Sequence, residues 1–364
     1  MVPRTVQLVG RTGLASFFSG FRRASSEATG IAGSPIRRLR SEVFGPSNLD
    51  LQELDVGLYA ADPHRLLVPP GQRGRVFGGQ VVGQAMHAAT LTLPTDGRSV
   101  HSLHAYFLKA GRTDRPILYH VENTSDSRSF STRRVLARQA GAIIYQCQVS
   151  FQVSEESDLE HALPMPLGVP KPEDCRSMDE IFEGYRGDPR VQGTSEEATA
   201  SRAALEQMAD FVARNPIEVR PTHEADPLDP DPHPRAPKMS VWMRTRLPLG
   251  ANPNLHLCSA AFFSDLCLLP TGLLPHGINF PGISSMTKLS LMASLDHAMW
   301  FHSPFRADEW VLYDLDSPRA AGNRTLVFGR LYNQAGVLCA SVAQEGVVRK
   351  RKAGDQQTAP VLPV

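Results

Sequence analysis

One carboxylate stands in an otherwise apolar stretch of the sequence and is the first candidate for chemistry. Asp265 lies within Cys258–Leu269, which we interpret as a buried helix closed by Pro270 and Gly272. Burying a carboxylate without partners is costly, so Asp265 needs hydrogen-bond partners, a cavity or a raised pKa. It either makes a structural hydrogen bond to nearby backbone or faces a pocket, where it can polarise water and accept a proton.

Two polar side chains on predicted strands could act with this carboxylate. Ser294 shares the alternation of an apolar strand, where a satisfied core hydroxyl is the ordinary interpretation. No Gly-x-Ser-x-Gly turn surrounds Ser294, which argues against a nucleophilic serine. Gln344 lies on the final predicted strand, just before Glu345-Gly346. Its neutral amide can orient a water molecule but does not easily supply a proton.

The histidines offer alternative bases but no metal site. His101 and His104 lie three residues apart on one predicted strand and therefore point to opposite faces. Asp296 and His297 are adjacent on another strand, so for the same reason they cannot form a dyad. The glycine pair Gly78-Gly79 lacks the remainder of a nucleotide-binding pattern.

The overall composition excludes several classes of partner. The 364 residues carry 38 Lys and Arg against 37 Asp and Glu, which gives no reason to expect nucleic acid or an acidic membrane surface. No apolar run approaches the ~18 residues that a membrane span needs. The five cysteines show no Cys-x-x-Cys spacing, which indicates a reduced, intracellular protein without structural metal. We expect no cofactor and no metal.

The chain uses one pattern twice, which indicates a duplicated domain rather than a solenoid. From the shared Phe to the shared Tyr the spacing is identical in the two copies: Phe107, Arg112, Asp114 and Tyr119 in the first, and Phe301, Arg306, Asp308 and Tyr313 in the second. Gln139-Ala140-Gly141 likewise returns as Gln334-Ala335-Gly336.

Each copy is predicted to be an α+β unit, a buried helix followed by antiparallel strands. The first has a helix over 76–89 and strands over 100–108, 116–122, 129–137 and 142–151, and the last two strands are joined by a hairpin turn at Ala140-Gly141. The second has a helix over 255–269 and strands over 287–302, 309–315, 324–333 and 337–348.

The remaining segments lie before, between and after these two units. Residues 1–40 are Arg-rich, Ser-rich and poor in acids, which is typical of an organelle transit peptide; a disordered tail or a start-site extension are the alternatives. We assign residues 41–155 to the first unit and 239–349 to the second. Residues 156–238 form a connector with a helix over 198–213 and a surface loop over 222–237, and 350–364 form a disordered tail.

Several motifs, in order, resemble the acyl-CoA thioesterase II family, which contains bacterial thioesterase II and the peroxisomal acyl-CoA thioesterase (choloyl-CoA hydrolase) of animals. They occupy 76–85, 101–107, 295–302 and 343–347, within a resemblance that covers about residues 48–349. The resemblance implies a double hotdog fold, two tandem units that are each a long helix wrapped by an antiparallel sheet. It also implies an active site of Asp265, Ser294 and Gln344, in which Asp265 accepts a proton from a water held by the other two.

The function implied by this resemblance is hydrolysis of fatty acyl-CoA, and of branched or bile-acid CoA esters, to free acid and coenzyme A. Backbone N–H groups at a hotdog helix N-terminus would stabilise the oxyanion. Two alternatives stay open: an enoyl-CoA hydratase with His101 or His104 as base, and a non-catalytic acyl-CoA binding protein.

The resemblance also implies a homo-oligomer in the peroxisomal matrix. The chain, however, ends Leu362-Pro363-Val364 instead of in the Ser-Lys-Leu signal. The basic N-terminus favours the mitochondrial matrix, and the cytosol is a further alternative.

Overall fold

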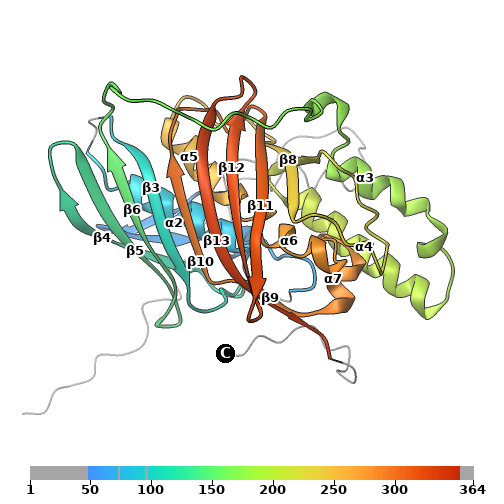
Figure 1. Ribbon diagram of the computed structural model, residues 1–364. Helices are drawn as coiled ribbons and strands as arrows, with labels where there is room; N and C mark the ends of the chain where they lie inside the picture. The colour runs from blue at the N-terminus through green and yellow to red at the C-terminus, as the bar shows by residue number, and fades with distance from the viewer. Residues whose placement is uncertain (1–47, 73, 95–96, 353–364) are drawn as a thin grey trace, which may run out of the picture. The chain divides into compact units, whose positions relative to one another are not determined.

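A single antiparallel sheet runs through the molecule. The computed structural model describes residues 48–72, 74–94 and 97–352, so the predictions for residues 1–40 and for most of the tail lie outside the described residues. The sheet has 13 strands in the order β1-β2-β4-β5-β6-β3-β10-β13-β12-β11-β8-β7, with β9 paired to β13. Helices α2 (Gly78–Thr90) and α5 (Pro253–Ser264) lie together behind the middle of this sheet (Figure 1).

The strands of the first unit follow the predicted boundaries to within a few residues. Before α2, the chain forms two short strands and a 3-10 turn at Pro63–Arg65. The strands are β1 (Gln52–Asp55), β2 (Leu58–Ala61), β3 (Ser99–Phe107), β4 (Ile117–Asp126), β5 (Phe130–Gln139) and β6 (Ala142–Gln152).

In the second unit, the prediction of one continuous strand over 287–302 is wrong. The strand begins only after a short helix and breaks at Leu295, whose N–H donates to Glu345 while its carbonyl accepts from Phe107 N–H. The break lets the chain leave an edge position beside β13 and enter between β13 and β3. The elements are β8 (Lys238–Thr245), α7 (Ile283–Lys288), β9 (Leu289–Ser294), β10 (Asp296–Phe301), β11 (Val311–Ala321), β12 (Arg324–Asn333) and β13 (Leu338–Lys350).

The duplication seen in the sequence is repeated in the backbone. The order β2-β4-β5-β6-β3 in the first unit matches β8-β11-β12-β13-β10 in the second. The two units join where β3 pairs with β10, and there Leu103 faces Met299 while Ala105 faces His297. By the shared spacing to Phe107 and Phe301, Leu103 is equivalent to His297 and Ala105 to Met299. The pairing is therefore symmetric. Such a self-complementary contact is the mark of a two-fold relation, here between halves of one chain.

A shared irregularity supports the same relation. In β6 the carbonyl of Ile144 accepts hydrogen bonds from two successive N–H groups, those of Leu108 and Lys109. In β13 the carbonyl of Cys339 accepts in the same way from His302 and Ser303.

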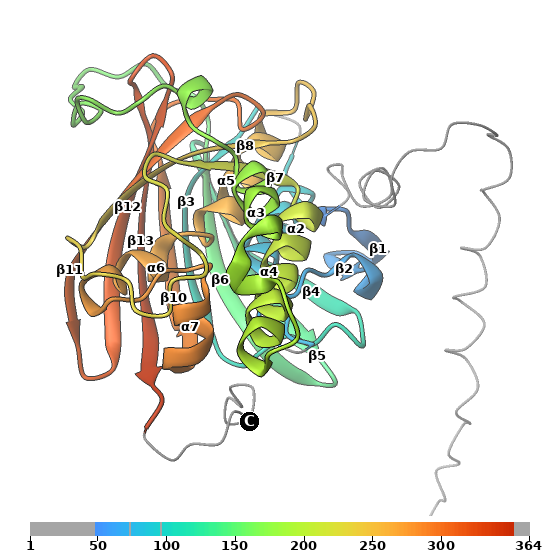
Figure 2. The same ribbon diagram turned by 90° about the vertical axis from the view of Figure 1, so that its right-hand side faces the viewer.

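The connector contributes structure of its own. After β6 it crosses the rim of the sheet and forms α3 (Met178–Gly184), α4 (Glu196–Arg214) and β7 (Ile217–Pro221), which pairs with β8 (Figures 1 and 2). Helix α3 begins with a capping box of Ser177 and Glu180. No helix or strand occurs over 222–237. The connector also holds the short 3-10 turns Pro172–Asp174, Tyr185–Gly187 and Pro189–Val191, and a further one, Leu274–His276, lies in the second unit.

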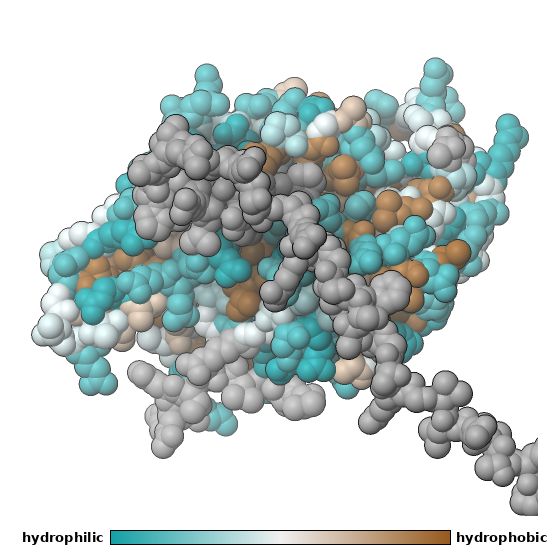
Figure 3. Space-filling view, turned by 180° about the vertical axis from the view of Figure 1, so that it is seen from behind, coloured by the Kyte–Doolittle hydropathy of each residue, from teal (hydrophilic) through white to brown (hydrophobic). Residues whose placement is uncertain are grey.

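The most apolar helical segment belongs to the core. Pro253–His276 is long and apolar enough to cross a membrane by composition alone, a property not expected from the sequence. However, 83% of its most apolar window is buried inside the protein, as in a core helix of a globular protein. The face seen from behind is largely hydrophilic, with separate apolar patches between the polar side chains (Figure 3).

Helices α2 and α5 approach so closely that α2 must carry glycine at the contact. A Cβ atom on Gly79 would lie 2.2 Å from the carbonyl oxygen of Phe262, and one on Gly83 would lie 3.0 Å from that of Cys258. Both obstacles are backbone atoms, which cannot move aside as a side chain can. The Gly-rich start of α2 is therefore explained by packing against the second unit.

We predict that Gly79→Ala lowers the free energy of unfolding by about 3 kcal/mol or more, because the added methyl group forces the two central helices apart. Urea unfolding followed by circular dichroism would measure the change. Gly187→Ala is the matched control, since a Cβ there meets nothing within 4 Å. We expect that control to change stability by less than about 0.5 kcal/mol. Equal effects of the two substitutions would contradict the close-packing argument.

Candidate active site

The three residues predicted for the active site meet at one point. The Ser294 hydroxyl donates a hydrogen bond of 3.2 Å to Asp265 Oδ1. The Gln344 amide nitrogen donates to the same carboxylate oxygen at 2.9 Å and to Ser294 Oγ at 2.8 Å. These three polar atoms form a closed triangle, although the residues come from separate segments of the second unit.

Strand register brings two of the three together. Ser294 ends β9 and pairs with Gly346 of β13, so Gln344, two residues earlier on β13, is its diagonal neighbour on the same face. A Cβ on Gly346 would lie 2.4 Å from the side chain of Leu269 and 3.0 Å from the carbonyl oxygen of Ala293, so a larger residue there would displace Leu269. The glycine thus allows the segment after α5, which carries Asp265, to lie against this part of β13.

The position of Asp265 in its helix corrects the sequence prediction. Helix α5 ends at Ser264, and Asp265 is its C-cap, followed by the separate short helix α6 (Leu268–Thr271). The carboxylate therefore leaves the helix and meets the N-terminus of α2, where the Gly79 N–H donates a hydrogen bond to it. A helix N-terminus attracts negative charge, so the first unit stabilises a carboxylate of the second.

The environment makes Asp265 a base suited to near-neutral pH. Burial raises its pKa to about 6, against the opposing effect of the hydrogen bonds from Gln344, Ser294 and the Gly79 N–H. Burial also raises the pKa of nearby Tyr145 and Tyr313 well above the ordinary tyrosine value. Asp265 is thus the group of this cluster whose charge changes near neutrality.

A fourth polar residue, His297, was not assigned to the site from sequence. It lies on β10 with its side chain fully buried, and its Nδ1 is hydrogen-bonded to Gln344 Oε1. Its Nε2 lies 2.9 Å from Ser264 Oγ. Burial lowers the pKa of His297 to about 4, so the ring is neutral. One feature of the sequence could have indicated this: side chains alternate along a strand, so His297 lies on the same face of β10 as the buried Met299.

The other histidines singled out in the sequence lie apart from the three site residues. The Asp296 carboxylate accepts from the Glu345 N–H at 2.7 Å, away from its neighbour His297. His101 is hydrogen-bonded to Ser150 Oγ at 2.8 Å, and exposed His104 packs its ring edge against Trp300. Neither lies among the residues that line the cavity at Asp265. Among the described residues, no cluster of three or more His, Cys, Asp or Glu side chains could hold a metal ion.

Asp265 and Ser294 line a cavity of about 580 Å³, whereas fully buried Gln344 lies behind them. This volume is typical of small-molecule sites, which span about 300–1,000 Å³. A second cavity of about 550 Å³ adjoins the first along α4 and α7. The two share lining residues Pro69, Gln72, Arg75, Phe280, Leu291 and Met292.

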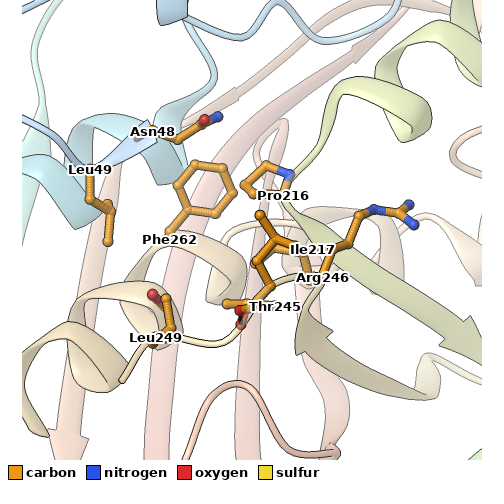
Figure 4. A pocket seen from close by; sticks show the side chains of 10 residues that line it. Asn48, Leu49, Pro216, Ile217, Thr245, Arg246, Leu249 and Phe262 are labelled. Carbon is orange, nitrogen blue, oxygen red and sulfur yellow. Dashed lines mark hydrogen bonds between the residues drawn. The ribbon is translucent and has the colours of Figure 1, made fainter. Parts of the chain in front are cut away.

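A third pocket, shown in Figure 4, is too small for a substrate. It holds about 20 Å³, enough for one water molecule. Phe262 of α5 points into it towards Asn48 and Leu49, opposite Pro216 and Ile217 (Figure 4). The ring of Phe262 also lies 5.4 Å from that of Phe77, at the start of α2. This pocket therefore belongs to the packing that supports the α2–α5 contact.

We predict that the raised pKa of Asp265 makes the wild-type protein lose stability, relative to Asp265→Asn, as pH rises. A carboxyl group with a folded-state pKa of about 6 stabilises the fold fully below about pH 4, and this contribution disappears above about pH 6. The difference between the two proteins should change by up to about 3 kcal/mol across this interval. Chemical denaturation at several pH values would measure it, and a constant difference would contradict the raised pKa.

Comparison with known proteins agrees with this architecture. The family model for the acyl-CoA thioesterase N-terminal domain matches residues 68–152, and that for the C-terminal domain matches 172–348. Acyl-coenzyme A thioesterase 8 of Rattus norvegicus is 41% identical over 86% of this chain and 91% of its own length. Acyl-CoA thioesterase 2 of Haemophilus influenzae is 35% identical over 76% of this chain and 88% of its own length.

A solved structure shows the same relation. The crystal structure of an acyl-CoA thioesterase II from Mycobacterium marinum superposes with a TM-score of 0.61 at 35% identity, and the match covers 84% of this chain and 98% of that one. The α+β fold of two tandem hotdog units, predicted from the sequence, is thereby confirmed. The chain therefore belongs to the acyl-CoA thioesterase II family.

Proposed function

We propose that this protein hydrolyses acyl-CoA thioesters to a free acid and coenzyme A, with a water molecule activated by Asp265. The observation that carries the proposal is the triangle of Asp265, Ser294 and Gln344, two of whose members line a substrate-sized cavity. A carboxylate with a pKa of about 6 is half ionised near that pH and can take a proton from water.

In this mechanism the water lies in the cavity against Asp265 and Ser294. Asp265 removes one proton as the water oxygen attacks the thioester carbonyl carbon. The carbon–sulfur bond then breaks, and the coenzyme A thiolate leaves and takes the proton from Asp265. Because a thiolate leaves readily, the site needs no separate strong acid. Gln344 holds Asp265 and Ser294 in place from behind.

The oxyanion of this reaction has a donor at the start of α2. Gly78, the first residue of the helix, lines the cavity beside Asp265. For its N–H, the structure records no acceptor among the residues it describes. The next N–H, of Gly79, is already bonded to Asp265. An N–H at a helix N-terminus that has no other acceptor can stabilise negative charge that develops beside it in the transition state.

The cavity walls suit both parts of an acyl-CoA. Val81, Phe107, Leu266 and Leu269 provide an apolar surface for the acyl chain. Four cationic side chains line the same cavity: Arg75, Lys109, Arg324 and Arg349. Asp265 is the single acid recorded among its lining residues. Such a surplus of positive charge attracts the phosphates of coenzyme A. The adjoining cavity extends the space available to long or branched chains.

The two competing functions have weaker support. A hydratase that used His101 or His104 would need one of them at the cavity, and neither lines it. A protein that only bound acyl-CoA would have no need for a carboxylate with a raised pKa held by three hydrogen bonds.

The test is the release of free thiol from a panel of acyl-CoAs, from short to long chains, by wild type and Asp265→Asn. We expect wild type to release thiol, and the variant to lose turnover on the order of 10²–10³-fold, as when other groups that stabilise a transition state are removed. Asp296→Asn is the matched control, because Asp296 lies close by but outside the cavity lining, and an asparagine can still accept from the Glu345 N–H.

Ser294→Ala and Gln344→Ala should each lose less turnover than Asp265→Asn, and their effects should not add, because the three residues serve one water molecule. Thermal unfolding of every variant would show that it is folded. Full activity in Asp265→Asn would sink the site assignment. No thiol release by wild type from any acyl-CoA would sink the proposed reaction.

Two finer predictions concern where and in what state the protein works. By resemblance to its family, we place it in the peroxisomal matrix as an association of identical chains. Fluorescence microscopy of the full chain with a tag at either end would test the compartment, and residence in mitochondria or cytosol would contradict it. Sedimentation velocity would test the association, which a single species at the monomer mass of 39.9 kDa would contradict.

A further inference from the structure

His297 is the buried titratable residue that the mechanism above leaves unused. It is fully buried and is not among the residues that line the Asp265 cavity, so it does not reach the substrate. Both ring nitrogens are nevertheless engaged, Nδ1 by Gln344 and Nε2 by Ser264. A histidine with two defined partners next to a catalytic group calls for a specific explanation.

The hydrogen-bond directions in this cluster determine one another. Ionised Asp265 can only accept, so the Gln344 NH₂ group must face it and the Gln344 carbonyl oxygen must face away. That oxygen also can only accept, so His297 must carry its proton on Nδ1. Nε2 of the neutral ring is then an acceptor, and the Ser264 hydroxyl, 2.9 Å away, is the donor available to it. The same hydroxyl lies 3.0 Å from the Ala261 carbonyl oxygen, so its one proton goes to Nε2 in place of that carbonyl when the ring is protonated on Nδ1.

The result is a chain of donors that runs in one direction towards the carboxylate. Ser264 donates to His297, His297 donates to Gln344, and Gln344 donates to both Asp265 and Ser294. Because each group has its proton fixed by the group before it, the orientation of the Gln344 amide depends on His297.

The duplicated unit provides an internal comparison. The shared spacing to Phe107 and Phe301 makes Leu103 the counterpart of His297, and the shared Gln-Ala-Gly turns make Val149 the counterpart of Gln344. Leu103 and Val149 face each other on β3 and β6, and both are fully buried. The same pair of positions is thus filled by two apolar residues in one unit and by a hydrogen-bonded polar pair in the other.

The comparison of the two units shows that packing alone does not explain the polar pair His297 and Gln344. The first unit shows that leucine opposite valine fills this place in the fold, so the fold does not require a polar pair there. A buried polar pair costs desolvation that an apolar pair avoids. Its presence in the second unit alone, next to the carboxylate, therefore points to a role in the site.

We propose that His297 is a positioning residue, which holds the Gln344 amide in the one orientation that donates to both Asp265 and Ser294. The inference rests on the proposed function for its kinetic consequence. Without the imidazole, the amide can turn its oxygen towards the carboxylate. Asp265 and Ser294 would then lose the donor that holds them, and water would be less well placed for attack.

The test compares His297→Leu with His297→Asn. Leucine has the shape that the first unit accepts but donates nothing, whereas the asparagine NH₂ can occupy the place of Nδ1–H. For His297→Leu we expect a fall in kcat on the order of 10- to 100-fold, the range seen when a residue that orients another functional group is removed. The KM should stay within about twofold, because His297 does not line the cavity. We expect His297→Asn to recover most of the lost kcat.

A second measurement reads the same arrangement without any turnover. The hydrogen bond from Gln344 lowers the pKa of Asp265, so its loss should raise that pKa further. The stability difference that Asp265→Asn produces should therefore change at higher pH in the His297→Leu background than in the wild-type background. The neighbouring Tyr145 and Tyr313 do not interfere, because their pKa values are raised far above this interval. His297, with a pKa lowered from 6.5 to about 4, does contribute in this interval, but its contribution is common to the two proteins compared within the wild-type background and cancels in their difference.

Two controls separate positioning from packing. The double variant His297→Leu/Gln344→Val reproduces the apolar pair of the first unit, and we expect it to be at least as stable as His297→Leu yet as slow or slower. Leu103→Ala damages the equivalent core position of the other unit, and should lower the melting temperature without moving the pH dependence.

The outcomes are distinct. Wild-type kcat in His297→Leu, or equal losses in the leucine and asparagine variants with no shift in the pH dependence, would overturn the proposal. If wild type released no thiol from any acyl-CoA, the proposed function would fail. The stability measurement would still decide the role of His297, since a shift in the His297→Leu background supports positioning and no shift rejects it.

Discussion

The close contact between α2 and α5 sets the arrangement of both units and of the site between them. The backbones approach until Gly79 has no room for a methyl group against Phe262, and this approach brings the N-terminus of α2 onto the carboxylate of Asp265. One contact therefore closes the interface between the two units and supplies the base with a backbone hydrogen bond. It also places Gly78 in the lining of the cavity beside Asp265. Neither unit holds all parts of this arrangement, which explains why the two must pack as a pair.

The site balances burial against hydrogen bonding. Burial raises the pKa of Asp265, while three donors lower it, and the result of about 6 keeps the carboxylate ionised at neutral pH without making it a very weak base. The donors are arranged in order, from Ser264 through His297 to Gln344. Because a buried network is stable only when every member has a partner, this order leaves little freedom in how the carboxylate is held.

The two duplicated units share one backbone plan but contribute different parts of the site. Both retain the same strand order, the same irregularity near the start of the last strand and the same Arg–Asp pair, formed by Arg112 with Asp114 and by Arg306 with Asp308. In the first unit the buried positions that face each other on β3 and β6 are apolar, with Leu103 opposite Val149. In the second the equivalent positions carry the polar pair His297 and Gln344. The first unit contributes a helix N-terminus and cavity wall, and the second contributes the side chains that we propose act on water.

Periodicity and motifs in the chain were sufficient to predict the duplication, the strands with a clear alternation and the family, and they singled out the three residues that meet in the proposed site. These properties are local, or can be compared position by position. The folded structure was needed to show that α5 ends at Ser264, that the strand before Phe301 breaks at Leu295, and that His297 joins the site. The reason is that each of these depends on a contact with a distant segment: Asp265 with the start of α2, Leu295 with β3 and β13, and His297 with Gln344. Local sequence carries the preference of a residue for helix, strand or core, but its partners across the fold decide where an element stops and which buried polar group belongs to the chemistry.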